Sequence, residues 1–579
     1  MLEKGQFWRN KLLREHVSVV EDKLAPSIVF TNGVYLNIHT KRWIKANIWI
    51  YKDRIVYVGD RMPKITDGTD VIDCTGQYLV PGYIEVHSHP AQFYNPEAFA
   101  VYSAKYGTTT LINDNLRLLY LLDKKKAFSM MEEFQQLPIS MFWWARYDSQ
   151  SKLINDDEKF NTDDILSWIN HPLVIQGGEL SAWPQLLSGD DRLLYLIQET
   201  KRLNKRVEGH FPGASIDTLT KLKLLGASAD HEAITGEEVV RRLELGYHVS
   251  LRYSSVRPDL PHLLQSLLED NLQAFDQMTF TTDGAPPANE KGTINNCIRV
   301  AIETGVDSID AFRMATLNGA KYLGIDEVVG SIAPGRLAHI NILYEKDDPT
   351  PLSVLGKGKW IVRDGSVKIN QQYIKWEEYD FEPFHISWDL TLDDLQFSIP
   401  IGLKMKNDVI IEPYAVETDI TVDNLPTNNN DSFLVLLDRY GKWRVNTVIK
   451  GFTNQLGGLC STFSTTGDMI LIGKRKEDMR LAFNRSKEIG GGIVLVHQGD
   501  ILYELPLQLK GAMYSDTFEN LQKEKSEITK IMIESGYKYN DPIHCLLYLS
   551  AIHLPYVRVT PKGIVDVKDQ DVIVPANMR

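Results

Sequence analysis

The sequence predicts an α/β protein built around a distorted, TIM-like (β/α)8 barrel, with a small discontinuous β-sandwich domain and an additional C-terminal α/β domain. The first observation is that apolar runs alternate with amphipathic helical stretches from about residue 84 to residue 323, which is typical of parallel βα units. The second is that short β-branched and aromatic runs, broken by turn residues, occur on both sides of that region. At 579 residues the chain is long enough for several domains.

The small β domain is predicted from two segments of the chain. Residues 1–26 are charged from Glu3 and Lys4 onward and lack the apolar core of a signal peptide. We expect them to form a helical extension instead. From residue 27 to 80, strand candidates separated by turn signals such as Asn32-Gly33 predict an antiparallel β unit. The same pattern returns in residues 328–375, so we expect the chain to re-enter this unit and complete it.

The barrel is predicted to span residues 81–327. Its strand candidates are short apolar runs, each followed by an amphipathic stretch, as in a barrel of parallel βα units. These runs are residues 83–86, 108–114, 139–145, 173–179, 206–210, 226–232, 247–252 and 278–283. A further α/β domain is expected over residues 376–579, beyond a polar stretch.

Composition excludes several classes of protein. The chain has 63 Lys and Arg against 76 Asp and Glu, a net charge of −13, which argues against binding to nucleic acid or to an anionic membrane. No window approaches the roughly 18 apolar residues of a membrane span. Only four cysteines occur, far apart in the chain, so neither a disulfide framework nor a thiolate zinc site is indicated. We therefore expect a cytoplasmic protein that acts on a small molecule.

Histidines and carboxylates stand at the ends of the predicted barrel strands, where the active sites of such barrels are built. His87 and His89 alternate along a strand, so both imidazoles share one face. Taken singly, these residues have ordinary explanations, such as a surface histidine or an acid that caps the next helix. Together they offer four imidazoles and two carboxylates, which suits a two-metal site with a position left for water. The six residues are His87, His89, Glu179, His210, His231 and Asp283.

Longer segments carry a resemblance to a known family. The string LVPGYIEVHSHP resembles the metal-binding signature of the amidohydrolase superfamily, and SIAPGRLAHINIL is similar to the segment that closes its small β domain. Four further strings resemble the bacterial adenine deaminase family: GHFPGASIDTLTKLKLLGASADHE, FRMATLNGAKYLGI, EIGGGIVLV and VTPKGIVDV. The resemblance runs from about residue 28 to the C-terminus.

The resemblance implies a binuclear metal centre and a hydrolytic deamination. Two divalent ions, Mn²⁺ or Fe²⁺ in preference to Zn²⁺, would lower the pKa of a bridging water, and the hydroxide would attack the carbon that bears the amino group. Adenine, or a related amino-heterocycle, would lose ammonia, giving hypoxanthine in the case of adenine. Asp283 would take the proton of the water and deliver it to the leaving amine. The implied ligands, all present in this chain, are His87, His89, His210, His231 and Asp283, with Glu179 as the bridge.

Three more residues are candidates for contacts with the substrate. Glu232 is a candidate for the acid that protonates a ring nitrogen, with a structural salt bridge as the alternative. Because adjacent strand residues point to opposite faces, this role requires that the strand has ended before Glu232. Phe93 and Tyr94 follow the paired histidines and are candidates for an aromatic floor under a planar ring, with ordinary packing as the alternative.

The chain departs from the family pattern at four places. The family's Asp-Pro-His-Glu is here Asp114-Asn115-Leu116-Arg117, and a Glu of the family is here Ala91. Gly284 replaces an acid that follows the metal-binding Asp, and residues 464–468 replace the family's His-Asp-Ser-His-Asn. These changes spare the implied ligands and fall on the expected pocket. Arg117 would favour a substrate with a carboxylate, carbonyl or phosphate, unless it pairs with Asp114 or faces solvent.

Two other functions therefore stay open beside deamination. One is hydrolysis of a cyclic amide, which the same hydroxide would attack. The other is a catalytically silent relative that binds purines. As partners we expect a small heterocyclic molecule, no nucleic acid and no membrane, and a homo-oligomer, most simply a dimer.

Overall fold

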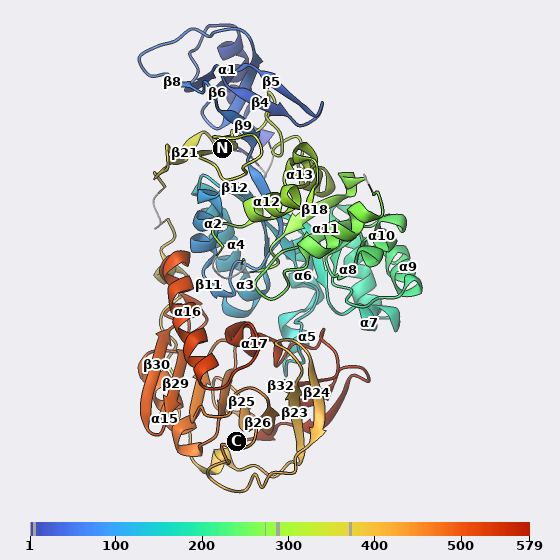
Figure 1. The fold of residues 1–579 in the computed structure, drawn as a ribbon, viewed down its shortest axis with the longest axis vertical. Coiled ribbons are helices and arrows are strands. Elements are labelled where there is room, and N and C mark those ends of the chain that lie inside the picture. The colour runs from blue at the N-terminus through green and yellow to red at the C-terminus, as the bar shows by residue number, and fades with distance from the viewer. Residues whose placement is uncertain (1, 4–6, 273, 285, 287–289, 370–372) are drawn as a thin grey trace.

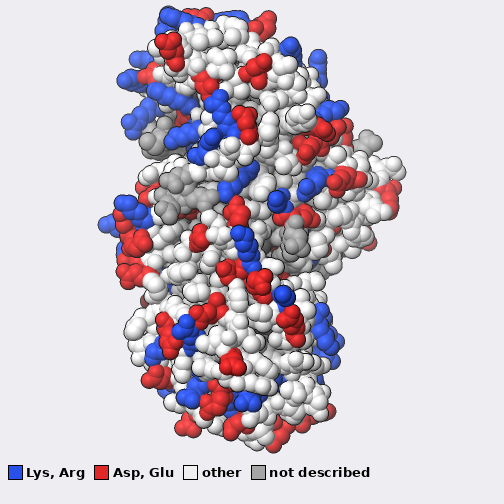
Figure 2. All heavy atoms as spheres, turned by 60° about the vertical axis from the view of Figure 1, so that its left-hand side comes forward, with Lys and Arg blue, Asp and Glu red and all other residues white. Residues whose placement is uncertain are grey.

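The computed structural model describes residues 2–3, 7–272, 274–284, 286, 290–369 and 373–579. The small β domain lies at one end of the molecule, the barrel in the middle and the C-terminal domain at the other end (Figure 1). None of the helices in the described part of the chain combines the length and the apolar character of a membrane span. Lys and Arg are interspersed with Asp and Glu over the face shown in Figure 2.

The small β domain consists of two sheets. Their strands come from the segments of the chain before and after the barrel. The four-stranded sheet has the order β7-β6-β3-β8, and the seven-stranded sheet has the order β22-β21-β20-β19-β9-β4-β5. Apolar side chains of both sheets, such as Phe30 and Ile340, share one core, which makes the unit a sandwich. Its strands are β3 (Ile28–Thr31), β4 (Val34–Asn37), β5 (Arg42–Lys45), β6 (Asn47–Tyr51), β7 (Arg54–Gly59), β8 (Asp70–Asp73), β9 (Tyr78–Pro81), β19 (Ile340–Leu343), β20 (Ser353–Gly356), β21 (Lys359–Arg363) and β22 (Ser366–Val367).

Near the N-terminus, α1 (Asn10–Val20) packs on this domain through Val19, which contacts a small cluster with Trp49. Two short strands, β1 (Leu2–Glu3) and β2 (Phe7–Trp8), pair with each other before it. Where the structure describes it, from residue 2 to 3 and from 7 on, the predicted helical extension therefore contains one helix of 11 residues.

The barrel has eight parallel strands in chain order, and all eight strand predictions are confirmed. Its strands are β10 (Tyr83–Ser88), β12 (Thr108–Asp114), β13 (Ser140–Ala145), β14 (Val174–Leu180), β15 (Arg206–Gly209), β16 (Ala229–Asp230), β17 (His248–Arg252) and β18 (Met278–Thr281). Nearly every residue of these strands is buried, because side chains fill the barrel on one face and helices cover the other. The last strand meets the first through Thr281 Oγ1, which donates to the His87 carbonyl at 2.7 Å.

Helices surround these strands and connect them. The N-terminus of several is capped by a side chain, as where Asn95 accepts from Ala98 N ahead of α2. The helices are α2 (Pro96–Lys105), α3 (Leu116–Leu121), α4 (Lys124–Glu133), α5 (Asp156–Lys159), α6 (Thr162–Asn170), α7 (Trp183–Leu187), α8 (Asp191–Arg202), α9 (Ile216–Leu224), α10 (Gly236–Glu244), α11 (Leu260–Glu269), α12 (Ile294–Thr304), α13 (Ser308–Met314) and α14 (Leu317–Leu323).

The C-terminal domain is built on a large, mainly antiparallel sheet with the order β24-β23-β26-β25-β28-β27-β29-β30, to which β35 adds at β26. One face is covered by α15, whose Met479 and Phe483 join the sheet core. A second sheet has the order β32-β33-β34. The elements are β23 (Ile401–Met405), β24 (Ile411–Ala415), β25 (Asp431–Leu437), β26 (Trp443–Lys450), β27 (Gly458–Ser461), β28 (Met469–Gly473), α15 (Lys476–Glu488), β29 (Gly492–His497), β30 (Asp500–Pro506), α16 (Phe518–Glu534), α17 (Pro542–Tyr548), β32 (Val557–Thr560), β33 (Gly563–Asp566), β34 (Asp571–Pro575) and β35 (Asn577–Met578).

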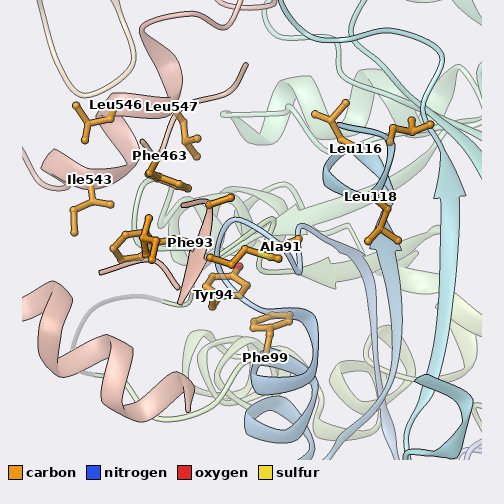
Figure 3. Close-up of a cluster of buried hydrophobic side chains, with 14 of the residues drawn as sticks. Ala91, Phe93, Tyr94, Phe99, Leu116, Leu118, Phe463, Ile543, Leu546 and Leu547 are labelled. Carbon is orange, nitrogen blue, oxygen red and sulfur yellow. The ribbon is translucent and has the colours of Figure 1, made fainter. Parts of the chain in front are cut away.

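A continuous apolar core joins the C-terminal domain to the barrel. The short strand β11 (Phe93–Tyr94) of the barrel pairs with β31 (Met513–Tyr514) of the C-terminal domain. Figure 3 shows Phe93 next to Phe463 and Tyr94 next to Phe99, in the same apolar cluster as the side chains of α17. Because this contact is apolar and continuous with both cores, α17 is held in a fixed position against the barrel.

Candidate metal centre and its pocket

Six polar side chains converge at the carboxyl ends of the barrel strands. They form three overlapping groups in which one potential ligand atom of each residue lies within 4.8 Å of the others. The groups are His87, His89 and Glu179; His87, His231 and Asp283; and Glu179, His210 and His231. The structure therefore brings all six predicted metal ligands together, from strands that lie far apart in the sequence.

Glu179 lies between two pairs of histidines at the end of β14. Its Oε2 is 3.8 Å from His87 Nε2 and 3.7 Å from His89 Nε2. Its Oε1 is 2.5 Å from His210 Nδ1 and 3.6 Å from His231 Nε2. Each oxygen of this one carboxylate thus faces one pair of imidazoles, which is the arrangement that a ligand bridging two cations requires.

Asp283 closes the cluster from the turn that follows β18. Its Oδ1 is 3.3 Å from His87 Nε2 and 3.1 Å from His89 Nε2, and its Oδ2 accepts from Arg252 Nη1 at 2.6 Å. The backbone of Asp283 is in the left-handed region, with φ of 49°, and Gly284 has φ of 129°. Few L side chains adopt the conformation of Gly284, so glycine suits the backbone at the place where the family pattern has an acid.

The residues fit a bound divalent metal. Both ring nitrogens of His87 are buried, and neither has a hydrogen-bond partner among the described residues. His210 Nδ1 lies 3.2 Å from His231 Nε2, so two ring nitrogens point at each other. Buried polar atoms normally have partners, and a cation in the cluster would give His87 Nε2 one. Imidazole and carboxylate ligands together suit Zn²⁺, Mn²⁺ and Fe²⁺.

A second set of charged side chains orients the histidines. Asp114 accepts from His89 Nδ1 at 2.8 Å, and Glu208 lies 3.3 Å from His231 Nδ1. Arg146 donates two hydrogen bonds to Asp114 and lies 2.8 Å from Glu179. Carboxylates behind metal-binding histidines fix the ring and its tautomer. The sequence did not single out Arg146, which directly follows a predicted strand, or Glu208, which lies within one.

Glu85 ties β10, the strand that carries His87, to the residues at the end of β18. It is fully buried and accepts from Thr281 Oγ1, from Thr282 N and from His87 N. Burial raises the pKa of this carboxyl to about 7, against the effect of these donors. Glu85 therefore fixes the strand from which His87 projects.

Beside the cluster lies a pocket between the barrel loops and the C-terminal domain. Its barrel side includes His89, Gln92, Asp114, Leu116, Arg117, Gln150, Glu179, His210, Glu232, Arg252, Arg257, Asp283 and Gly284. Its other side includes Val409, Thr465, His544, Leu547, Tyr548, Ala551, His553 and Leu554. The sequence carried no signal for the histidines of the second group, which come from a domain far along the chain.

Glu232 lies in the pocket wall, beyond the end of β16. Its Oε1 accepts from Arg252 Nη1 at 2.6 Å, and its Oε2 lies 3.6 Å from Arg257 Nη1. Although burial opposes ionisation, the Arg252 guanidinium holds the pKa of the Glu232 carboxyl below its ordinary value. The strand has ended before Glu232, as the predicted role requires, and the salt bridge of the alternative is present as well.

Arg117 also lies in the pocket wall but does not pair with Asp114. Its Nη2 donates to the carbonyl of Ser464 at 2.5 Å and its Nη1 to that of Thr465 at 3.4 Å. Asp114 is already occupied by Arg146 and His89. Burial lowers the pKa of Arg117 to about 10. The guanidinium thus holds the C-terminal domain at the edge of the pocket.

Phe93 and Tyr94 do not form the floor of the pocket, which corrects the sequence-based expectation for these two residues. They are 1% and 3% exposed and lie outside the pocket lining. Phe93 packs on Phe463 with ring centroids 5.0 Å apart, and Tyr94 stacks on Phe99 at 4.9 Å (Figure 3). The physical reason is the pairing of β11 with β31, which turns both rings into the core between the domains.

Comparison with known proteins assigns the family. Residues 78–361 match the model of the Amidohydrolase family, and residues 408–571 match that of the Adenine deaminase C-terminal domain. A protein of Oceanobacillus iheyensis named "Putative adenine deaminase" is 53% identical over 579 residues, with 100% of both chains covered. This chain belongs to the adenine deaminase family. A family member from Cenarchaeum symbiosum, named "Adenine deaminase", is 28% identical over 568 residues, covering 94% of this chain and 92% of that protein.

Membership of the adenine deaminase family makes the chain a hydrolase of C–N bonds that acts on a small molecule. The family and the cluster of histidines and carboxylates together imply a divalent metal. The departures from the family pattern gather at the pocket: Leu116, Arg117, Gly284 and Thr465 line it, while Ala91 and Ser464 are buried close by.

Proposed function

We propose that the protein catalyses the hydrolytic deamination of adenine, in which adenine and water give hypoxanthine and ammonia. The observation that carries the proposal is the position of Glu179, with one carboxylate oxygen toward His87 and His89 and the other toward His210 and His231. The names of the full-length relatives point to the same substrate.

The proposal includes two divalent ions, Mn²⁺ or Fe²⁺ in preference to Zn²⁺. His87, His89 and Asp283 would hold one side of the centre and His210 and His231 the other, with Glu179 shared. Bound ions of this kind supply an acidified water and polarise the substrate. The buried ring nitrogens of His87 support a metal at this place.

Two carboxylates are proposed to move the protons. Asp283 takes a proton from the attacking water as the C–O bond forms, and returns it to the amino group as the C–N bond breaks and ammonia leaves. Glu232, in its protonated form, gives a proton to the neighbouring ring nitrogen as the C–O bond forms, and takes one back from the new hydroxyl as the carbonyl of the product forms. Both side chains line the pocket, and both accept from the same Arg252 Nη1. Arg252 therefore fixes their separation.

The test is ammonia release by Mn²⁺-loaded protein, measured with adenine, other aminopurines and aminopyrimidines, with the metal counted in the same sample. Release from adenine would support the proposal. Ammonia release from a different amino-heterocycle only would make that compound the substrate of the same mechanism, because Leu116 and Arg117 change the pocket wall. No release with two metals bound per chain would favour a cyclic amide substrate or a silent purine-binding protein.

The remaining expectations from the sequence stay predictions beside this one. They are a role in purine salvage, a cytoplasmic location, a homodimer and the division of the chain into residues 1–26, 27–80 with 328–375, 81–327 and 376–579. Light scattering on the purified protein would measure the dimer directly. The four cysteines, all free and buried, are in keeping with a reducing compartment.

A further inference from the structure

One face of α17 closes the pocket from the C-terminal domain. His544, Leu547 and Tyr548 line the pocket, with the three- and four-residue spacing of one helical face, and Ala551 lines it just beyond the end of the helix. Ile543 and Leu546 of the same helix belong to the core between the domains (Figure 3). The pocket face of α17 is therefore held rigidly opposite the cluster of metal-ligating residues.

On this face of α17, a charged partner holds the imidazole ring of His544 in place. Its Nδ1 lies 2.8 Å from Asp541 Oδ2, and its backbone N–H donates to Asp541 Oδ1 at 3.1 Å. Both residues are more than nine-tenths buried, at 4% and 3% exposure. An aspartate that faces one ring nitrogen sets the tautomer and the orientation of the imidazole.

Asp541 is itself held from two other elements. Lys525 of α16 donates to Asp541 Oδ2 at 2.5 Å and also lies 3.2 Å from His544 Nδ1. Ser255, in the loop after β17 of the barrel, donates to the same carboxylate oxygen at 3.3 Å. The carboxylate thus has a counter-ion, and a barrel loop that lines the pocket is tied to it.

Of the two contacts of Nδ1, the one with Asp541 is shorter, at 2.8 Å against 3.2 Å to Lys525, so we assign the Nδ1 proton to the bond with Asp541. Nε2 then keeps a lone pair on the side of the ring away from that carboxylate. We propose that His544 Nε2 accepts a hydrogen bond from a ring N–H of the substrate, so that the C-terminal domain selects a free heterocyclic base over one substituted at that nitrogen. This inference rests on the proposed function. When the amino group of adenine lies at the metal cluster, the five-membered ring, which carries the N–H, lies toward the opposite wall of the pocket.

The experiment compares adenine with 9-methyladenine, which lacks that N–H. Binding to Mn²⁺-loaded protein is measured by calorimetry, and turnover by ammonia release. The variants are His544→Phe, which removes the acceptor, and His544→Gln, whose amide oxygen reaches about as far as Nε2. Asp541→Asn keeps an N-cap for α17 but removes the charge that sets the tautomer. His262→Asn, at an exposed histidine of α11, is the matched control.

Wild-type protein and His262→Asn should prefer adenine over 9-methyladenine. His544→Phe should weaken adenine binding and raise its KM roughly ten-fold, as for one lost hydrogen bond, while 9-methyladenine changes little. His544→Gln should restore part of the preference. Asp541→Asn should raise KM for adenine with a smaller effect on kcat, which a purely structural role would not produce.

The failures are distinguishable. If wild-type protein releases ammonia from adenine and His544→Phe keeps the full preference, the deamination stands and the role of His544 is overturned. A second outcome is that no ammonia is released, but wild-type protein binds adenine in preference to 9-methyladenine and His544→Phe loses this preference. The recognition then stands without the reaction. If neither adenine nor 9-methyladenine binds or reacts with metal-loaded protein, both proposals are overturned.

Discussion

Arg117 donates to the backbone carbonyl of Ser464, so two departures from the family pattern, 347 residues apart in the chain, meet at the pocket wall. Thr465 O receives the other arm of the same guanidinium. The guanidinium on the barrel side of the pocket thus binds two carbonyl oxygens of the C-terminal domain. Because the contact joins the two segments, a substitution in one of them should affect the position of the other.

The first prediction concerns this contact. Arg117→Met should lower the free energy of unfolding by about 1–3 kcal/mol, because it leaves two buried carbonyls without their donor. Arg117→Glu should destabilise further, since a carboxylate would face carbonyl oxygens. Urea unfolding measures both, with Arg117→Lys as the control that keeps the charge.

The same contact predicts how activity should respond to substitutions in the pocket wall. Leu116→His with Arg117→Glu restores the family residues, but it should not raise the rate on adenine unless residues 464–468 are restored as well. A gain from the barrel substitutions alone would show that the contact does not constrain the pocket.

The second prediction concerns Asp283. Asp283→Asn should lower kcat at least about 100-fold, because the amide cannot accept the proton of the attacking water. Although burial opposes ionisation, Arg252 holds the pKa of the Asp283 carboxyl well below its ordinary value, so the carboxylate is ready to accept. Ammonia release and metal content are measured together. Wild-type turnover by a variant that retains its metal would contradict the proton-transfer role.

Glu232 provides the third prediction. If it exchanges a proton with the ring, Glu232→Gln should lower kcat while the thermal midpoint changes little, because the amide oxygen can still accept from Arg252. If Glu232 is only the ion-pair partner of Arg252, kcat per folded protein should stay near the wild-type value. Thermal unfolding and initial rates on the same preparations separate the two.

The sequence predicted the barrel and its six convergent residues because both depend on local signals. A strand buried on both faces reads as a continuous apolar run, as in residues 141–145, and His87 and His89 mark the end of another strand candidate. What escaped prediction depends on pairing between distant segments. Arg146 was missed because its carboxylate partners lie on other strands, and His544 because another domain supplies it.

The error at Phe93 and Tyr94 has the same origin. Their place directly after the paired histidines suggested a pocket floor, but the pairing of β11 with β31 decides where the rings point. No pattern within residues 93–94 records a strand more than 400 residues away.

The fourth prediction is a pH dependence of stability at Asp468. Burial raises the pKa of this carboxyl to about 7, above its ordinary value of 3.8. Between these values the folded protein keeps a proton that the unfolded chain releases, so the free energy of unfolding should fall as the pH rises through this window. Asp468→Asn should flatten this fall and be the more stable protein at pH 8. Asp67→Asn, at an exposed site, should leave the profile unchanged.

The fifth prediction concerns the metal. Removing it with a chelator should lower the thermal midpoint, and adding Mn²⁺ at 100 times its dissociation constant should restore about 2.7 kcal/mol, because only the folded chain assembles the ligands. Glu179→Gln should lose most of this gain, since Glu179 faces both histidine pairs. Glu208→Gln, which loosens His231 without removing a ligand, should weaken metal affinity about 10- to 100-fold. An equal Mn²⁺-dependent shift in wild-type and Glu179→Gln protein would place the metal elsewhere.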